Sequence, residues 1–183
     1  ISLKQNPNFF LGPPHLRSVE IRVVPDENTS VSMLRTGEID FMYQPSIVTY
    51  PPIRDIPGVH VVWDQMNGWA GVQVNMSHPP LNDPRVRAAI ALAIDKTKIV
   101  QTVTYGKESV ATGDIPDWNW AARGLPPYGG ADAAKAKSIL QQAGVRKLSL
   151  LLIADAANAT HHRVAVELQS MLQGAGIETE IKY

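Results

Sequence analysis

A short apolar run, an amphipathic helix and a second strand follow one another near the C-terminal end of the sequence. Residues 148–153 read Leu-Ser-Leu-Leu-Leu-Ile, an apolar run of strand length. Apolar residues recur at helical spacing over residues 160–173, and residues 177–183 alternate apolar and polar side chains. The sequence therefore predicts strand, helix and strand in this order, which favours a fold in which helices pack on a sheet.

The same alternation of helices and strands runs through the rest of the chain. N-cap residues, helical spacing and terminating glycines predict further helices over residues 30–36, 84–94, 96–104 and 133–143. Strand-like apolar patterns predict further strands over residues 19–24, 39–43, 59–63 and 70–74. Strands interspersed with helices indicate an α/β protein, with a central mixed β-sheet flanked by helices.

Charge and cysteine content narrow the kinds of function. The 17 basic and 17 acidic residues cancel without any run of like charge, so we predict no nucleic-acid partner and a neutral or small ligand. The absence of cysteine rules out disulfides, thiolate zinc sites and a cysteine nucleophile. No apolar run approaches the roughly 20 residues of a membrane span, so the chain is not expected to span a membrane. Residues 1–10 are too polar for a signal peptide, and we expect any export signal upstream.

Sequence motifs of common enzymes are missing from the chain. It has no Gly-x-Ser-x-Gly elbow, phosphate loop, dinucleotide glycine pattern or zinc-protease histidine pair. His161 and His162 are adjacent, so on a helix their side chains point about 100° apart and cannot chelate one metal ion. We therefore predict no enzymatic activity, no catalytic residue, no metal and no cofactor. A hydrolase domain is the alternative from a different functional class.

Several blocks of residues carry a family resemblance. Residues 4–10 read Lys-Gln-Asn-Pro-Asn-Phe-Phe, and residues 34–40 read Leu-Arg-Thr-Gly-Glu-Ile-Asp. The most specific block begins at Asn75 and continues as Pro-Leu-Asn-Asp-Pro-Arg-Val-Arg-Ala-Ala-Ile over residues 80–90. It is followed by Ala-Ile-Asp-Lys and, over residues 134–144, by Ala-Lys-Ala-Lys-Ser-Ile-Leu-Gln-Gln-Ala-Gly. In this order and spacing, the blocks resemble the peptide/nickel/opine class of solute-binding proteins, family 5 of the ABC-importer receptors.

The resemblance implies a fold and a function. It implies that residues 1–183 form a single α/β lobe of a type II periplasmic-binding-protein fold, an incomplete C-terminal lobe without the hinge return and the N-terminal lobe. Such a receptor closes on its solute in a cleft between lobes and presents it to ABC permease subunits in the membrane. We expect a periplasmic or extracytoplasmic monomer that captures a peptide or another small solute. A peptide-sensing or chaperone-like receptor without transport is the alternative.

The loop that follows the apolar strand is the first candidate binding site. Residues 154–160 read Ala-Asp-Ala-Ala-Asn-Ala-Thr and lead into a helix, whose free N-terminal amides suit a carboxylate or a polar backbone. The resemblance implies that dipeptide-binding relatives carry in this loop an arginine that pairs with the peptide's carboxylate, whereas this chain has Asp155. A longer peptide, a cation-bearing solute and another small molecule all stay open. We predict Asp155 and Asn158 as substrate-binding residues, with helix capping or solvent exposure as the alternative role.

Three tryptophans are the other predicted substrate-binding residues. Trp69 precedes the predicted strand at residues 70–74, while Trp118 and Trp120 lie in the long irregular connection formed by residues 107–130. Exposed aromatic walls can stack on peptide bonds or side chains, and connections of this length are often functional. The alternative is that these large side chains anchor the connection onto the domain.

Overall fold

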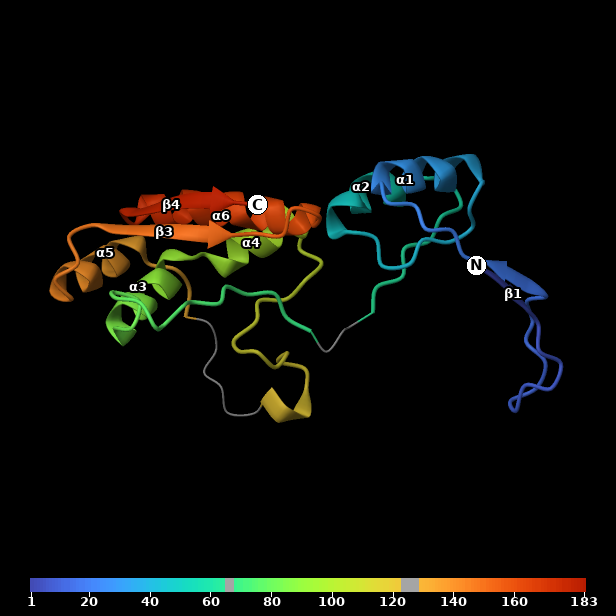
Figure 1. The fold of residues 1–183 in the computed structure, drawn as a ribbon, viewed down its shortest axis with the longest axis horizontal. Helices are drawn as coiled ribbons and strands as arrows, with labels where there is room; N and C mark the ends of the chain where they lie inside the picture. Colours follow the sequence, from blue (N-terminus) through green and yellow to red (C-terminus); the bar gives the residue numbers. More distant parts are fainter. Residues whose placement is uncertain (65–67, 123–128) are drawn as a thin grey trace.

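The computed structural model describes residues 1–64, 68–122 and 129–183. The N-terminal elements are β1 (Ser2–Lys4), β2 (Ser18–Glu20), α1 (Glu27–Thr36), the 3₁₀ turn η1 (Ile47–Thr49) and α2 (Tyr50–Arg54). The later elements are α3 (Pro84–Ala93), α4 (Lys96–Val103), the 3₁₀ turn η2 (Trp120–Ala122), α5 (Ala133–Gln142), β3 (Leu148–Ile153), α6 (Ala159–Gly174) and β4 (Ile177–Lys182). Figure 1 shows that α1 and α2 lie at one end of the molecule and α3, α5 and the β3–β4 pair at the other.

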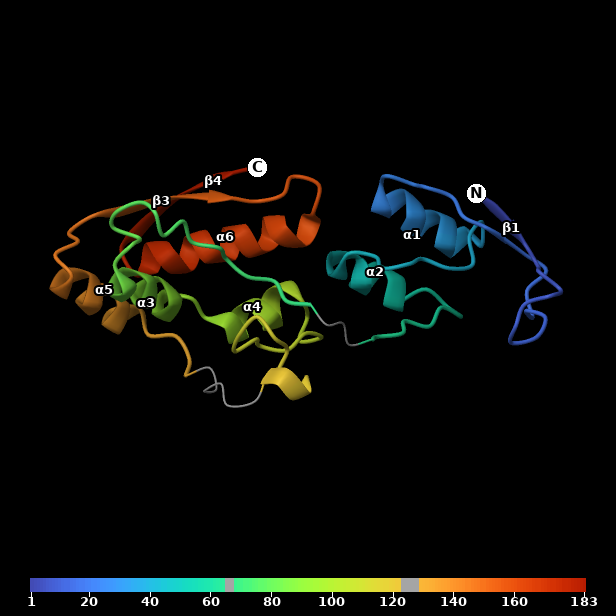
Figure 2. The same cartoon turned by 60° about the horizontal axis from the view of Figure 1, so that its bottom comes forward.

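The strand, helix and strand predicted at the C-terminal end form a β–α–β unit. β3 and β4 pair in parallel, from Leu148 opposite Ile177 to Ile153 opposite Lys182. Because the strands are parallel, α6 must return the chain to the starting edge, and it packs along the inner face of the pair (Figure 2). Side chains alternate between the two faces of β3, so Leu148 is buried whereas Leu151 and Ile153 are exposed.

The larger hydrophobic core lies between this β–α–β unit and two helices that precede it. Its buried members come from α3, α5, α6, β3 and β4, with one residue from the turn after α6. They are Val86, Ala89, Ile90, Ala93, Ala136, Leu140, Leu148, Leu172, Ala175 and Ile177. Small residues on α3 and α5 allow those two helices to approach closely, which fits the apolar spacing seen in the sequence.

A second, smaller hydrophobic cluster lies in the N-terminal part. Val31 of α1 packs with Ile53 of α2 and with Ile56, which follows α2. α1 begins three residues before the predicted start at residue 30, because the Asp26 carboxylate caps it by accepting from the Thr29 amide at 2.7 Å. α1 ends, as predicted, at Gly37, whose φ of 73° suits glycine.

Several predicted strands are wrong for the described residues. The strand predicted over residues 19–24 is only Ser18–Glu20, and residues 39–43, 59–63 and 70–74 form no strand. The expected central mixed sheet is replaced, within the described part of the chain, by two separate pairs, antiparallel β1–β2 and parallel β3–β4. A strand needs a partner for its backbone groups, and the apolar patterns of these segments could not supply one.

The predicted helices agree closely with the structure. α3, α4, α5 and α6 each begin and end within one residue of the predicted bounds. Asp83, Asp95 and Asp132 cap the first three by accepting from backbone amides of their first turns. None of the helices in the described ranges is both long and apolar enough to cross a membrane.

The cap of α3 makes stability depend on pH. The Arg85 side chain hydrogen-bonds the Asp83 carboxylate, with Nη2 at 2.7 Å from Oδ2, and the Arg85 amide donates to Oδ1 at 2.8 Å. Both contacts lower the pKa of Asp83 below its ordinary value of 3.8. A carboxylate whose pKa is lower in the folded than in the unfolded state stabilises the fold at pH values above its unfolded-state pKa. This stabilisation is lost as the pH falls through the folded-state pKa.

We expect Asp83→Asn to flatten the acid side of the stability profile. Asparagine can still accept the amide hydrogen bond of the cap, but it does not titrate. In urea unfolding followed by circular dichroism, the free energy of unfolding of the unchanged chain should fall more steeply between pH 5 and pH 2 than that of the variant. The difference should correspond to the protonation of a single carboxylate. Parallel profiles for the two proteins would contradict this assignment.

Candidate ligand-binding site

The loop after β3 is held in one shape by its own side chains. Asn158 caps α6, since its Oδ1 accepts from the amides of Thr160 and His161, each at 3.0 Å. The Asp155 carboxylate accepts from the Ala157 amide at 2.9 Å and is otherwise exposed. Two of the N-terminal amides that the sequence suggested for a ligand are therefore taken by the cap, while the charge of Asp155 stays available.

Residues at the start of α6 and the end of β4 enclose the loop from the side. The rings of His162 and Tyr183 stack with centroids 3.9 Å apart and an interplanar angle of 5°. The Nε2 atom of His162 lies 3.1 Å from the Ala156 carbonyl oxygen, and the Ala154 amide donates to Lys182 at 2.9 Å, extending the strand pairing by one residue. These contacts fix the loop against the carboxyl ends of two parallel strands, where α/β proteins commonly bind ligands.

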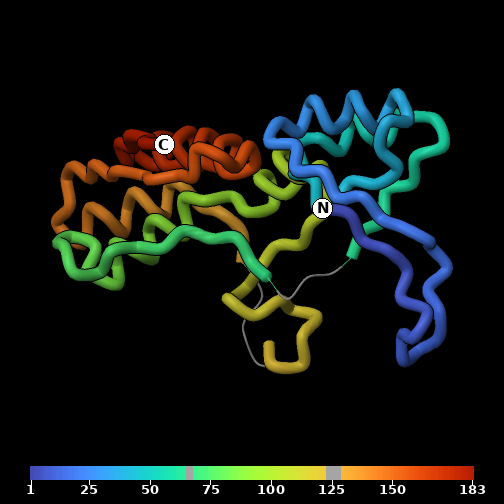
Figure 3. The backbone as a smooth tube through the Cα atoms, turned by 45° about the vertical axis from the view of Figure 1, so that its right-hand side comes forward, coloured from blue at the N-terminus to red at the C-terminus, as the bar shows by residue number. Residues whose placement is uncertain are grey.

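The N-terminal part of the chain contacts the start of α6. The hydroxyl oxygens of Ser46 and Thr160 are 3.0 Å apart in a hydrogen bond that joins residues 114 positions apart in the sequence. Ser46 directly precedes η1, which contacts α6. Figure 3 shows the two parts of the chain meeting near this point. We call this region the junction. It comprises residues 46–64, α4, the turn after α4 and the start of α6.

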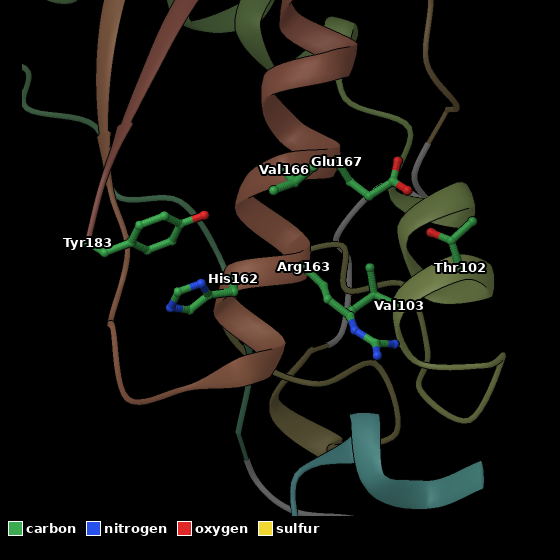
Figure 4. A pocket seen from close by; sticks show the side chains of 7 residues that line it. All are labelled: Thr102, Val103, His162, Arg163, Val166, Glu167 and Tyr183. Carbon is green, nitrogen blue, oxygen red and sulfur yellow. The ribbon is translucent and has the colours of Figure 1, made fainter.

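A cavity of about 310 Å³ lies beside the junction, between α4, α6 and the end of β4. Its lining residues are Thr102, Val103, His162, Arg163, Val166, Glu167 and Tyr183. Figure 4 shows the His162 and Tyr183 rings on one side of α6 and the side chains of Arg163, Thr102 and Val103 on the other. The cavity is open to solvent, and its lining combines aromatic, apolar and charged groups.

Two interactions order the charged side of the cavity. Arg163 donates from Nη1 to the Tyr105 hydroxyl oxygen at 2.7 Å. Glu167 lies one turn further along α6, and its carboxylate is 3.7 Å from the ammonium of Lys98 on α4. The Arg163 guanidinium is therefore paired with the Tyr105 hydroxyl, whereas the Glu167 carboxylate on the same helix is paired with Lys98.

The five predicted site residues do not gather at one place. Asp155 and Asn158 share the loop at the junction, but neither lines the cavity. Trp118 and Trp120 are 45% and 81% exposed, and the turn η2 that begins at Trp120 lies apart from this loop in Figures 1 and 2. Trp69 is 49% exposed, and its indole ring covers Gly71 so closely that a Cβ there would clash with the ring. Whether these side chains contact a ligand stays a prediction.

Several residues that line or adjoin the cavity beside the junction were missed by sequence reasoning. Tyr105, His162, Arg163 and Tyr183 carried no local signal, because their partners lie on elements that are distant in the sequence. Within the described ranges, no three His, Cys, Asp or Glu side chains come together in a way that could hold a metal ion. Residues 123–128 of the predicted irregular connection lie outside the described part of the chain.

Comparison with known proteins places the chain in a family. A sequence profile described as bacterial extracellular solute-binding proteins, family 5 Middle, matches residues 1–183. The probable di/tripeptide-binding protein 5 of Pseudomonas aeruginosa is 32% identical over 180 residues, which are 97% of this chain and 34% of that protein. The chain spans about a third of the length of the curated relatives it matches.

Solved structures agree with this match. The oligopeptide-binding protein AppA from Bacillus subtilis, in complex with a nonapeptide, has a TM-score of 0.73 and 27% identity over 99% of this chain and 39% of AppA. NikZ from Campylobacter jejuni, in complex with Ni(L-His), has a TM-score of 0.84 over 99% of this chain and 39% of NikZ, and at 20% identity it shows the fold alone. These neighbours confirm the α/β type II periplasmic-binding-protein fold, and the chain covers 39% of each of them. The chain belongs to the bacterial extracellular solute-binding proteins of family 5.

Proposed function

We propose that this chain is part of an extracytoplasmic receptor that captures a peptide or another small solute for an ABC importer. The observation that carries the proposal is the family match over all 183 residues, because the family is described as solute-binding. Relatives named for di- and tripeptides, and an AppA structure that holds a nonapeptide, support a peptide as one class of solute. A relative named as a probable ABC transporter periplasmic-binding protein supports transport as the output.

The geometry of the junction supports the same role. A loop at the carboxyl ends of parallel strands, a cavity beside it and a segment from the other part of the chain meet there. Such an arrangement offers a surface on which a solute could be held by non-covalent contacts. Asp155 would contribute a negative charge at the rim, and Trp69, Trp118 and Trp120 are proposed as aromatic contacts. That residues 1–183 form one lobe of the receptor, and that the receptor is monomeric and periplasmic, belong to the same proposal.

Native mass spectrometry of the receptor that contains this chain, purified from its source without added ligand, tests the proposal. A solute enclosed between lobes leaves slowly, so we expect a protein peak with an additional small mass that disappears after denaturation. Repeated preparations that show only the mass of the protein, and no binding to a library of peptides and small solutes, would contradict the receptor role.

The variant Asp155→Asn sharpens the same experiment. Asparagine keeps the hydrogen bond from the Ala157 amide, because its side-chain oxygen can still accept, and it removes only the charge. If the retained solute carries a positive group, we expect the retained fraction to fall several-fold. The matched control is Glu180→Gln, which removes an exposed carboxylate from the outer face of β4. Equal retention in both variants would remove Asp155 from the site.

A further inference from the structure

Three aromatic rings meet at the junction from two parts of the chain. The Tyr50 ring, at the start of α2, lies 5.2 Å from the Trp63 ring in an edge-to-face arrangement with an interplanar angle of 69°. The Tyr105 ring, in the turn after α4, lies 6.3 Å from the Tyr50 ring. We call Tyr50, Trp63 and Tyr105 the aromatic cluster. Trp63 is partly exposed, so part of the cluster faces solvent.

Three cations surround the same rings. The Lys107 ammonium lies 5.2 Å from the Tyr50 centroid and 5.9 Å from the Trp63 centroid, and the Arg54 guanidinium lies 5.6 Å from the Tyr50 centroid. Arg163 donates to the Tyr105 hydroxyl at 2.7 Å. A ring face attracts one cation, but the cations gathered around a shared pair of tyrosines also repel each other.

Only one of these three cations has a carboxylate partner in the described part of the chain. Arg54 pairs with Asp55 at 3.1 Å, and both side chains are exposed to solvent. Among residues 1–64, 68–122 and 129–183, neither Lys107 nor Arg163 forms a salt bridge, although Glu167 lies one turn from Arg163 and pairs with Lys98 instead. Lys107 and Arg163 thus lie beside a partly exposed ring without a carboxylate partner among the described residues, and an anion would stabilise this arrangement.

The turn that presents Tyr105 and Lys107 has a defined, unusual backbone. Tyr105 has a φ of 54° and Gly106 a φ of 70°, so two successive residues occupy the left-handed region. The Gly106 amide donates to Val100 at 2.9 Å, and the Lys107 amide donates to Thr104 at 2.9 Å. A tyrosine rarely adopts this conformation, and such residues concentrate at functional sites. The turn directs one ring and one ammonium toward α2.

We propose that the aromatic cluster with Lys107, Arg54 and Arg163 is a binding site for a carboxylate attached to a planar group. The Lys107 ammonium contacts the ring faces on one side and keeps its other hydrogens for the carboxylate, while the exposed part of the Trp63 ring stacks on the planar group. The proposal rests on the proposed receptor function, because it assumes that the solute enters at the junction. It differs from a clamp at the loop of residues 154–158, since it uses side chains from α2, the segment after it and the turn after α4.

Titration of the 183-residue chain with three small probes, followed by ¹⁵N–¹H NMR at low salt, tests the proposal. Benzoate carries both groups, cyclohexanecarboxylate keeps the charge without the aromatic ring, and benzyl alcohol keeps the ring without the charge. We expect benzoate to bind at least about fivefold more tightly than either comparison compound, and to weaken as NaCl is added because the charges are exposed. Equal dissociation constants, or no saturable shift with benzoate, would overturn the proposal.

Substitutions at one lysine identify the site. Lys107→Gln should raise the benzoate dissociation constant about tenfold, and Lys107→Arg should leave it within about twofold because the charge is kept. Lys147→Gln is the matched control, since Lys147 is an exposed lysine that pairs with Glu178 at 3.2 Å beside the start of β4. Thermal melts of all variants report folding separately. An equal loss in the control, or no loss in Lys107→Gln, would show that the site lies elsewhere.

The outcome separates this proposal from the receptor function. If native mass spectrometry identifies a retained solute without an anionic group, the carboxylate site is wrong while the receptor function stands. If no solute is retained or bound from the library but benzoate binding depends on Lys107, the site stands and the receptor function fails.

Discussion

The substitution Ile177→Ala is expected to lower the free energy of unfolding by about 3 kcal/mol, within the 2–5 kcal/mol typical of buried isoleucine to alanine changes. Ile177 is fully buried at the start of β4, opposite Leu148 of β3. It belongs to the core that joins α3, α5, α6 and both strands, so truncation leaves a cavity that backbone elements on several sides cannot close. Urea unfolding of the 183-residue chain, followed by circular dichroism, measures the change.

The matched control is Ile153→Ala, at the C-terminal end of β3. Ile153 is 73% exposed, so the same chemical change removes little buried surface and should cost less than about 1 kcal/mol. The difference between the two variants measures burial rather than strand propensity, because both residues are isoleucines in the same pair of strands. Equal losses would mean that the outer face of the pair is covered as well, and that the core is not where the structure places it.

Asn158→Ala is expected to lower the free energy of unfolding by about 1–2 kcal/mol, the upper part of the range for the loss of a helix N-cap. Two amides at the start of α6 donate to this one side chain, at 3.0 Å each, and both lose their partner. The same turn carries Thr160, which hydrogen-bonds Ser46 across the junction. Hydrogen exchange of the first-turn amides should therefore accelerate, and urea unfolding gives the overall loss.

Asn158→Asp separates capping from ligand contact. Aspartate caps a helix as well as asparagine does, and its charge is favourable at the positive end of the helix dipole. We expect its stability to match or slightly exceed that of the unchanged chain. A variant that is stable but binds the retained solute more weakly would identify Asn158 as a ligand contact. An Asn158→Asp protein as unstable as Asn158→Ala would show that the cap geometry is not the source of the effect.

The helices illustrate what local signals can predict. α3 begins at Pro84 after the cap Asp83, and α5 begins after Asp132 and is followed by Gly144. Caps, spacing and terminating glycines act within a few residues, so the sequence contains the information for these bounds. The family blocks are of the same kind, since order and spacing along the chain identified the fold that the comparisons confirm.

The strands and the binding site could not be predicted from local sequence, because they depend on contacts with distant parts of the chain. Residues 39–43 and 59–63 have apolar patterns typical of strands, but a strand exists only when another segment pairs with its backbone, and within the described residues none does. Asp155 and Asn158 were predicted from the residues that surround them, whereas Trp118 and Trp120 lie in a segment whose path depends on packing.

The sequence by itself determined α3, α4, α5 and α6, the β–α–β order at the C-terminal end, the family and the absence of cysteine chemistry, whereas α2 was not predicted. Only the tertiary structure decided that Tyr50, Trp63 and Tyr105 would share one cluster with Lys107 and Arg163. These residues are separated by up to 113 positions, 163 − 50, and no local pattern marks them as neighbours. Helix bounds follow from contacts within one turn, whereas a site of this kind follows from how the two parts of the chain pack against each other.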